Sequence, residues 1–155
     1  MSEKTGPAPG WVDSHCHLDF PEFDGKMDEV RQEMRANGVT HALCISVNFA
    51  GFPKVLALAE AYDNFFATVG VHPDHEDRAE VDPLRLVELA RHPRIIAIGE
   101  TGLDYYRVSG DLEWQRERFR ATYAPRANAG SLSLSIRAKL PRTRSPSCGK
   151  RGRPK

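Results

Sequence analysis

Between Trp11 and about Arg120 the chain alternates between two hydrophobic periodicities, and this alternation constrains the fold more than any other feature. Short runs rich in Val, Ile, Thr and aromatic residues predict strands, whereas runs with apolar residues three and four positions apart predict helices. The expected strands are 11–17, 40–47, 65–71 and 94–102, and the expected helices are 24–37, 52–62, 82–92 and 111–120. Four successive strand-helix units predict an α/β fold, in which right-handed crossovers cover a parallel sheet with helices.

The third expected helix has the clearest start. Asp82 occupies the N-cap position, where its side chain can accept a backbone N–H, and Pro83 occupies the first helical position. The spacing of apolar residues along this helix turns Leu84, Val87 and Leu89 toward the core.

The charge of the chain divides it into two unlike pieces. The overall formal charge is +1, but residues 1–117 carry 11 basic and 21 acidic side chains, whereas residues 118–155 carry 11 basic and none acidic. Four prolines also lie after residue 120, and only 131–136 alternates as a strand would. The expected organisation is a disordered leader over 1–10, a folded part over 11–120 and a disordered basic tail over 121–155.

Three widely spaced cysteines, Cys16, Cys44 and Cys148, argue against a disulfide framework and favour a reducing compartment. The first ten residues lack the apolar core of a secretory signal, and no apolar stretch reaches the length of a membrane span. We therefore expect a cytoplasmic protein without membrane contacts.

The first expected strand ends in a possible metal-binding pair. Side chains on a strand repeat every two residues, so His15 and His17 share a face while Cys16 points away. Two imidazoles on one face can chelate a divalent cation, although such pairs also occur by chance at solvated strand ends. Asp13 could orient one of these imidazoles or only cap the strand.

An acidic residue ends the fourth expected strand. Glu100 follows the apolar run 95–98 and lies where that strand leaves the core, a place where a carboxylate is costly unless it is paired or binds a metal. The carboxyl ends of parallel strands are where α/β proteins build their sites. The alternative is an acidic residue in a surface turn, which is also what we expect of Asp104.

The third strand end carries two further histidines. His72 and His75 could contact a substrate phosphate or orient a ligand, although an exposed loop is the simpler interpretation for His75. With these, three of the four strand ends carry His or Glu, which favours one shared metal site. Tyr105, Tyr106 and Trp114 are more typical of packing than of base stacking.

Several motifs in order resemble the TatD family of metal-dependent hydrolases. They are V-D-S-H-C-H-L-D, G-V-H-P-D, A-I-G-E-T-G-L-D-Y-Y and W-Q-R-E-R-F-R, spread between Trp11 and Arg120. The resemblance implies a (β/α) TIM-barrel enzyme with one or two divalent metal ions that hydrolyses phosphodiester bonds in DNA. By position it implies metal binding by His15 and His17, a metal-binding and catalytic role for Glu100, and a substrate-binding role for His72.

The chain also departs from that family. A complete barrel needs about 250 residues, so only about four of eight units are expected here. The later metal-binding histidines and aspartate of the family have no counterpart, since no histidine follows His92 and no acidic residue follows Glu117. We expect a truncated, impaired hydrolase using Mg, Mn or Zn, with no obligate protein partner. The alternatives are a barrel hydrolase of a non-nucleic-acid substrate and a non-catalytic, basic-tailed fragment that binds nucleic acid.

The basic tail is compatible with translation in a shifted reading frame. In the shifted frame, each codon consists of the third base of one residue's codon and the first two bases of the next residue's codon. Read in this way from Ala121 onward, the permitted codons can spell H-I-R-A-A-R-E-C-G-K-P-L-A-V-H-T-R, with a histidine near position 136. This continuation is similar to the TatD family. We predict that sequencing the gene will reveal a one- or two-base change near codon 121 that restores the frame. If no such change restores it, the hypothesis is wrong.

Overall fold

The computed structural model describes residues 10–75, 81–123, 133–134 and 137–139. From Trp11 to Ile98 strands and helices alternate along the chain as the periodicities predict, and the short strand 102–104 follows the fourth of these strands without a helix between them. In order, the elements are β1 (Trp11–Cys16), the 3-10 turn η1 (Pro21–Phe23), α1 (Met27–Ala36), β2 (Val39–Cys44), α2 (Phe52–Ala61), β3 (Phe65–Val69), α3 (Pro83–Leu89), β4 (Ile95–Ile98), β5 (Gly102–Asp104), α4 (Glu113–Tyr123), β6 (Ser133–Leu134) and β7 (Arg137–Lys139).

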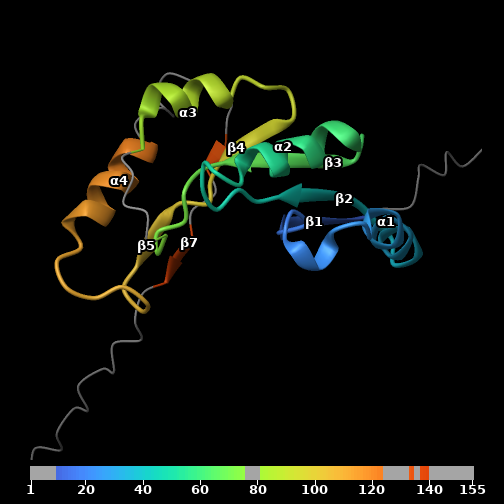
Figure 1. Cartoon of the computed structure of the whole chain (residues 1–155), viewed down its shortest axis with the longest axis horizontal. Helices are drawn as coiled ribbons and strands as arrows, with labels where there is room; N and C mark the ends of the chain where they lie inside the picture. Colours follow the sequence, from blue (N-terminus) through green and yellow to red (C-terminus); the bar gives the residue numbers. More distant parts are fainter. Residues whose placement is uncertain (1–9, 76–80, 124–132, 135–136, 140–155) are drawn as a thin grey trace, which may run out of the picture.

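Five of the strands form one parallel sheet in the order β1-β2-β3-β4-β6 (Figure 1). The first four strands therefore pair in sequence order, as expected for successive right-handed strand-helix units. The short strands β5 and β7 pair separately, also in parallel. Parallel pairing in sequence order brings the carboxyl ends of β1 to β4 to one edge of the sheet.

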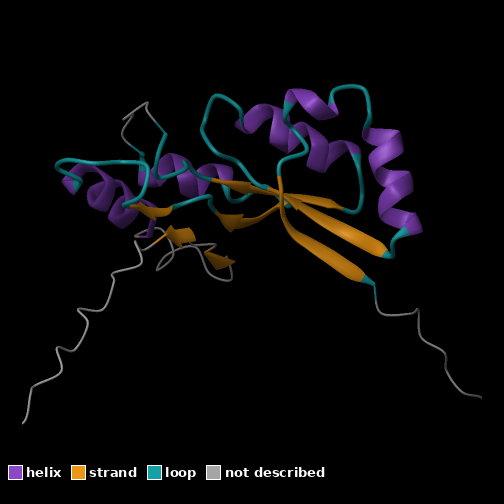
Figure 2. Ribbon diagram, turned by 90° about the horizontal axis from the view of Figure 1, so that it is seen from below, coloured by secondary structure: helices purple, strands orange, loops and turns teal. Residues whose placement is uncertain are grey.

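The helices of the described chain lie along one side of the strands (Figure 2). A doubly wound fold covers both faces of its sheet, whereas a (β/α) barrel keeps its helices on the outer face. The arrangement is that of a partial α/β barrel. Its core lies between the sheet and the helices, and the largest fully buried side chains in it include Phe65, Ile45, Leu86 and Ile98.

The third helix confirms one sequence prediction and corrects another. Asp82 caps α3 by accepting a hydrogen bond from the Leu84 backbone N–H at 2.9 Å, and Pro83 is its first residue. The predicted core face was wrong at Leu84, which is 79% exposed, whereas Leu89 is partly buried against the core and the unpredicted Leu86 and Ala90 are buried. Leu86 and Ala90 lie four residues apart and therefore share one side of the helix.

The predicted leader and tail lie mostly outside the described residues. Residues 1–9, 124–132, 135–136 and 140–155 are not described. Of the alternating run 131–136, Ser133 and Leu134 form β6 and pair with Ala97 and Ile98 of β4. Within the described ranges, no helix has the length and apolar character needed to cross a membrane.

The ends of β3 and β4 approach each other closely at Gly70. A Cβ atom built there would lie 2.5 Å from the carbonyl carbon of Gly99 and 2.8 Å from the carbonyl oxygen of Glu100. These are backbone atoms, which cannot rotate away as a side chain can. Glycine at position 70 thus lets the strand that precedes Glu100 pack directly on β3.

We predict that Gly70→Ala destabilises the fold by about 1–3 kcal/mol, because the added methyl group overpacks two backbone segments. Chemical denaturation of the purified variant measures this. Gly51→Ala is the matched control, since its Cβ would meet only Asn48 Oδ1 at 3.4 Å. Gly51 is the N-cap of α2, so a smaller cost, about 0.5–1 kcal/mol, is expected from the loss of a favourable capping residue. Equal stabilities of the two variants would contradict the prediction.

Candidate metal centre

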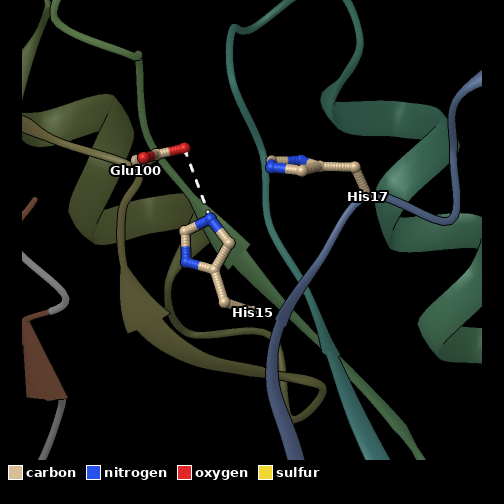
Figure 3. A group of neighbouring side chains, drawn as sticks. All are labelled: His15, His17 and Glu100. Atoms are coloured by element: carbon tan, nitrogen blue, oxygen red, sulfur yellow. Dashed lines mark ion pairs between the residues drawn. The ribbon is translucent and has the colours of Figure 1, made fainter.

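Three of the predicted ligands converge at the carboxyl edge of the sheet. His15 lies in β1, His17 directly after β1, and Glu100 two residues after β4. One ligand atom from each residue lies within 4.8 Å of the other two, and His15 Nε2 is 3.7 Å from Glu100 Oε2. Figure 3 shows the His15 and His17 rings and the Glu100 carboxylate turned toward a common space.

The donor set fits a divalent cation. Nitrogen and oxygen ligands bind such ions at about 2.0–2.2 Å, so two ligands on opposite sides of one ion lie about 4.4 Å apart. The observed limit of 4.8 Å is close to this separation. Glu100 is only 2% exposed, and a cation between it and the two imidazoles would offset the cost of burying its charge.

His17 is oriented by a backbone carbonyl. Its Nδ1 lies 3.2 Å from the Ile45 carbonyl oxygen, which can only accept a hydrogen bond. Nδ1 therefore carries the proton, and the lone pair of Nε2 is available for a metal. A hydrogen bond of this kind commonly fixes the tautomer and ring direction of metal-binding histidines.

The end of β2 positions all three strand-end residues through its backbone. Besides the Ile45 contact to His17, the Ser46 carbonyl accepts the Glu100 N–H at 2.9 Å, and the Val47 carbonyl accepts the His72 N–H at 2.8 Å. Segment 45–47 carries none of the predicted ligands. It is the template on which the neighbouring strand ends are aligned.

Buried hydroxyl groups hold this template in place. The Ser46 N–H donates to Thr68 Oγ1 at 3.1 Å, and the single O–H of Ser46 has the carbonyls of Asn48 and Gly70 as acceptors at 3.1 and 3.3 Å. Both Ser46 and Thr68 are fully buried. Sequence analysis missed these two residues, since a Ser or Thr in a strand carries no signal of such a role.

His72 lies against the opposite oxygen of Glu100. Its Nε2 is 3.6 Å from Glu100 Oε1, and its Nδ1 contacts the Asp74 carboxylate, which also accepts a 2.9 Å hydrogen bond from Arg107. Burial raises the pKa of Asp74, but the Arg107 hydrogen bond and the His72 charge outweigh it and hold that pKa below its ordinary value. Asp74 is therefore a carboxylate that anchors His72 beside Glu100.

Helix α4 fixes the same loop from the other side. Gln115 is fully buried and donates from Nε2 to the Pro73 carbonyl at 3.1 Å, while its Oε1 accepts the Asp104 N–H at 2.9 Å. Arg118 Nη1 donates to the His72 carbonyl at 3.4 Å. The W-Q-R-E-R-F-R motif thus connects the His72 loop to β5.

The roles left open for nearby residues can be assigned. Asp13 Oδ1 accepts the backbone N–H of His15 at 3.0 Å, which supports the strand-cap interpretation. Asp104 is a turn residue, as expected, because its carboxylate accepts two backbone N–H groups. Cys16 points away from the ligands and donates from Sγ to the Leu43 carbonyl, and both Cys16 and Cys44 are free thiols.

Asp19 is an acidic residue near the site to which sequence analysis assigned no role. It lies two residues after His17 and is 8% exposed, and burial raises the pKa of its carboxyl group. Its buried Oδ1 has no hydrogen-bond partner among the described residues. The motif D-S-H-C-H-L-D contains it, so the motif itself was the available signal.

Comparison with known proteins identifies a family. Residues 12–129 match the model of the family described as TatD related DNase. The chain is 32% identical over 109 residues to the uncharacterized metal-dependent hydrolase YabD of Bacillus subtilis, covering 70% of this chain and 43% of YabD. It is 33% identical over 139 residues to human deoxyribonuclease TATDN3, covering 82% of this chain and 50% of that protein.

Solved structures agree with this match. The TatD homolog YjjV from Escherichia coli K12 superposes with a TM-score of 0.67 at 28% identity, covering 83% of this chain and 51% of YjjV. A TatD family hydrolase from Entamoeba histolytica gives 0.70 at 25% identity, covering 82% and 49%. The chain therefore spans about half the length, or less, of the relatives described here.

We predict that Thr68→Val destabilises the protein by about 1–3 kcal/mol, because it removes the acceptor of the buried Ser46 N–H while keeping the side-chain shape. Denaturant titration measures the change. Thr40→Val is the matched control, since it removes the hydroxyl of an exposed residue of β2 whose hydrogen bond to the Trp11 carbonyl water can replace, and about 0.5 kcal/mol or less is expected from it. A Thr68→Val protein as stable as this control would show that the hydroxyl does not hold the template.

Proposed function

Because this chain belongs to the TatD family, we propose that it is the N-terminal part of a metal-dependent hydrolase that cleaves phosphodiester bonds of DNA. The observation that carries the proposal is the convergence of His15, His17 and Glu100 within 4.8 Å. These residues come from two strand ends that lie more than eighty positions apart in the sequence. The metal-dependent hydrolase class rests on the family, and DNA as the substrate is the further step.

The three residues would hold one or two divalent ions, with Glu100 as the carboxylate shared between them. Imidazole nitrogens with a carboxylate suit Zn, Mn or Mg. Such an ion supplies a hydroxide nucleophile near neutral pH and stabilises the negative charge that develops on a phosphate. In the chain itself, the Ile45 carbonyl holds His17 Nδ1–H, which leaves the Nε2 lone pair available to bind such an ion.

His72 is proposed to contact the substrate. Its side chain is 12% exposed and its Nε2 faces Glu100, so a group bound to the metal would lie within its reach. The Asp74 contact at Nδ1 and the backbone bond from His72 N–H to Val47 hold the ring in this direction. With Nδ1–H directed at Asp74, a ring that also carries a proton on Nε2 would donate a hydrogen bond from Nε2 to a phosphate oxygen without moving.

The choice of DNA has two supports. The human relative TATDN3 is named a deoxyribonuclease, and the matching family model is described as TatD related DNase. Residues 1–117 are strongly acidic and on their own would repel a phosphodiester. A divalent cation at the candidate centre would offset this repulsion, so a metal centre suits this substrate.

We predict that the 155-residue chain binds Mn²⁺ weakly, that His17→Ala abolishes this binding, and that duplex DNA is cleaved slowly or not at all. The physical reason is that three protein ligands bind a metal ion with low affinity, and removing the oriented imidazole leaves only two ligands. Isothermal titration calorimetry measures the binding, and gel analysis of a labelled duplex measures the cleavage.

His41→Ala is the control for this experiment. His41 is an exposed histidine in β2 that is not one of the three ligands. Equal Mn²⁺ binding by the His17 and His41 variants would refute the metal site. Robust DNA cleavage that His17→Ala abolishes would instead show that the 155 residues suffice for catalysis.

A further inference from the structure

The turn that follows β5 presents two side chains to solvent that the proposed chemistry does not use. Tyr106 is 77% exposed, and the Arg107 side chain is 53% exposed. Packing was the sequence expectation for Tyr106, and its exposure contradicts it. In Figure 1 the connection between β5 and α4 forms an outer edge of the molecule. We call residues 105–107 the Tyr106 turn.

Buried groups fix the Tyr106 turn. Asp104 Oδ1 accepts the backbone N–H groups of Tyr106 and Arg107 at 2.8 and 2.9 Å. Asp104 is 3% exposed, and Gln115 bonds both its N–H and its carbonyl. The backbone is therefore held on a rigid base while the two side chains project, which is the arrangement that binding residues require.

Polar contacts connect the turn to the metal centre. Arg107 Nη1 donates to Asp74 Oδ2 at 2.9 Å, the Asp74 carboxylate contacts His72, and His72 Nε2 is 3.6 Å from Glu100 Oε1. The guanidinium thus lies near the carboxylate that would bind metal. Its bond to Asp74 uses one of five N–H donors and holds the planar fork in a defined direction.

Arg107 is well placed to attract a phosphate. The other arginine bonded to this loop, Arg118, is 7% exposed, and its guanidinium lies 4.9 Å from the centre of the Trp114 ring. Arg118 supports the loop from inside, whereas Arg107 reaches solvent. In a strongly acidic part of the chain, an exposed guanidinium beside the site offsets the repulsion of an approaching phosphate.

We propose that the Tyr106 turn binds single-stranded DNA next to the metal centre, with Arg107 holding a backbone phosphate and Tyr106 stacking on a base. This inference rests on the proposed function, since it names how the substrate strand is held. An exposed aromatic ring beside a guanidinium is the combination that binds single strands without sequence preference. The Tyr106 turn binds the DNA strand on one side of the phosphodiester bond to be cleaved.

Fluorescence anisotropy with a labelled six-residue oligothymidylate tests this on the 155-residue chain in EDTA. Stacking contributes about 1–3 kcal/mol per base, so Tyr106→Ala should weaken binding about fivefold or more. Tyr106→Phe should keep the wild-type affinity. Arg107→Gln should weaken binding and lower the slope of log affinity against log salt by about 0.7, the value for one phosphate contact on a single strand.

Arg35→Gln is the matched control, because Arg35 is an exposed residue in the last turn of α1. It makes the same charge change and leaves the basic tail intact, so it should bind like wild type. Affinities of Tyr106→Ala and Arg107→Gln equal to that of Arg35→Gln would overturn the inference. Circular dichroism verifies the fold, and Tyr106 is exposed enough that its removal leaves the core unchanged.

Adding Mn²⁺ separates this inference from the proposed function. If Mn²⁺ strengthens binding in the wild type and not in His17→Ala, the metal centre contacts DNA whatever the turn variants do. If the turn variants weaken binding and Mn²⁺ has no effect, the turn is a DNA-binding site and the proposed hydrolase fails. A wild-type chain that does not bind the oligonucleotide overturns the inference.

Discussion

The site depends on the row of backbone carbonyls at the end of β2. Ile45, Ser46 and Val47 accept hydrogen bonds from His17, Glu100 and His72, which belong to three other strand ends. Successive carbonyls of a segment lie at fixed spacing, so the three acceptors set the relative positions of the three side chains. These three residues are thus aligned by backbone geometry, and their own side-chain preferences only complete the arrangement.

Much of this arrangement could be predicted from sequence because it follows from periodicity. Strand-helix alternation indicates parallel strands, and parallel strands in sequence order bring their carboxyl ends to one edge. We therefore expect a buried acidic residue that follows an apolar strand to meet two histidines separated by one residue at another strand end. Glu100, His15 and His17 meet in this way. The three side chains meet because each lies within two residues of a strand end.

Other features could not be predicted because they depend on long-range contacts without a local pattern. The Ile45 carbonyl that orients His17 is a backbone atom, and Gln115 reaches Pro73 across 42 positions. The error at Leu84 has a similar origin. Several apolar residues of α3 share a helical spacing, and only packing against the sheet selects Leu86 for the core. Likewise, the exposure of Tyr106 depends on the buried bonds of Asp104.

The hydrogen bonds that align His17, Glu100 and His72 join residues of the described part of the chain. Their donors and acceptors lie between residues 15 and 118. Strand β1 lies at the edge of the sheet, and its residues Trp11 and Val12 are 75% and 60% exposed. In a complete barrel, by contrast, parallel strands are buried on both faces. The contacts that align the three strand ends join β1 to β4, their loops and α4. Closure of a barrel needs, in addition, a strand that pairs with the outer edge of β1.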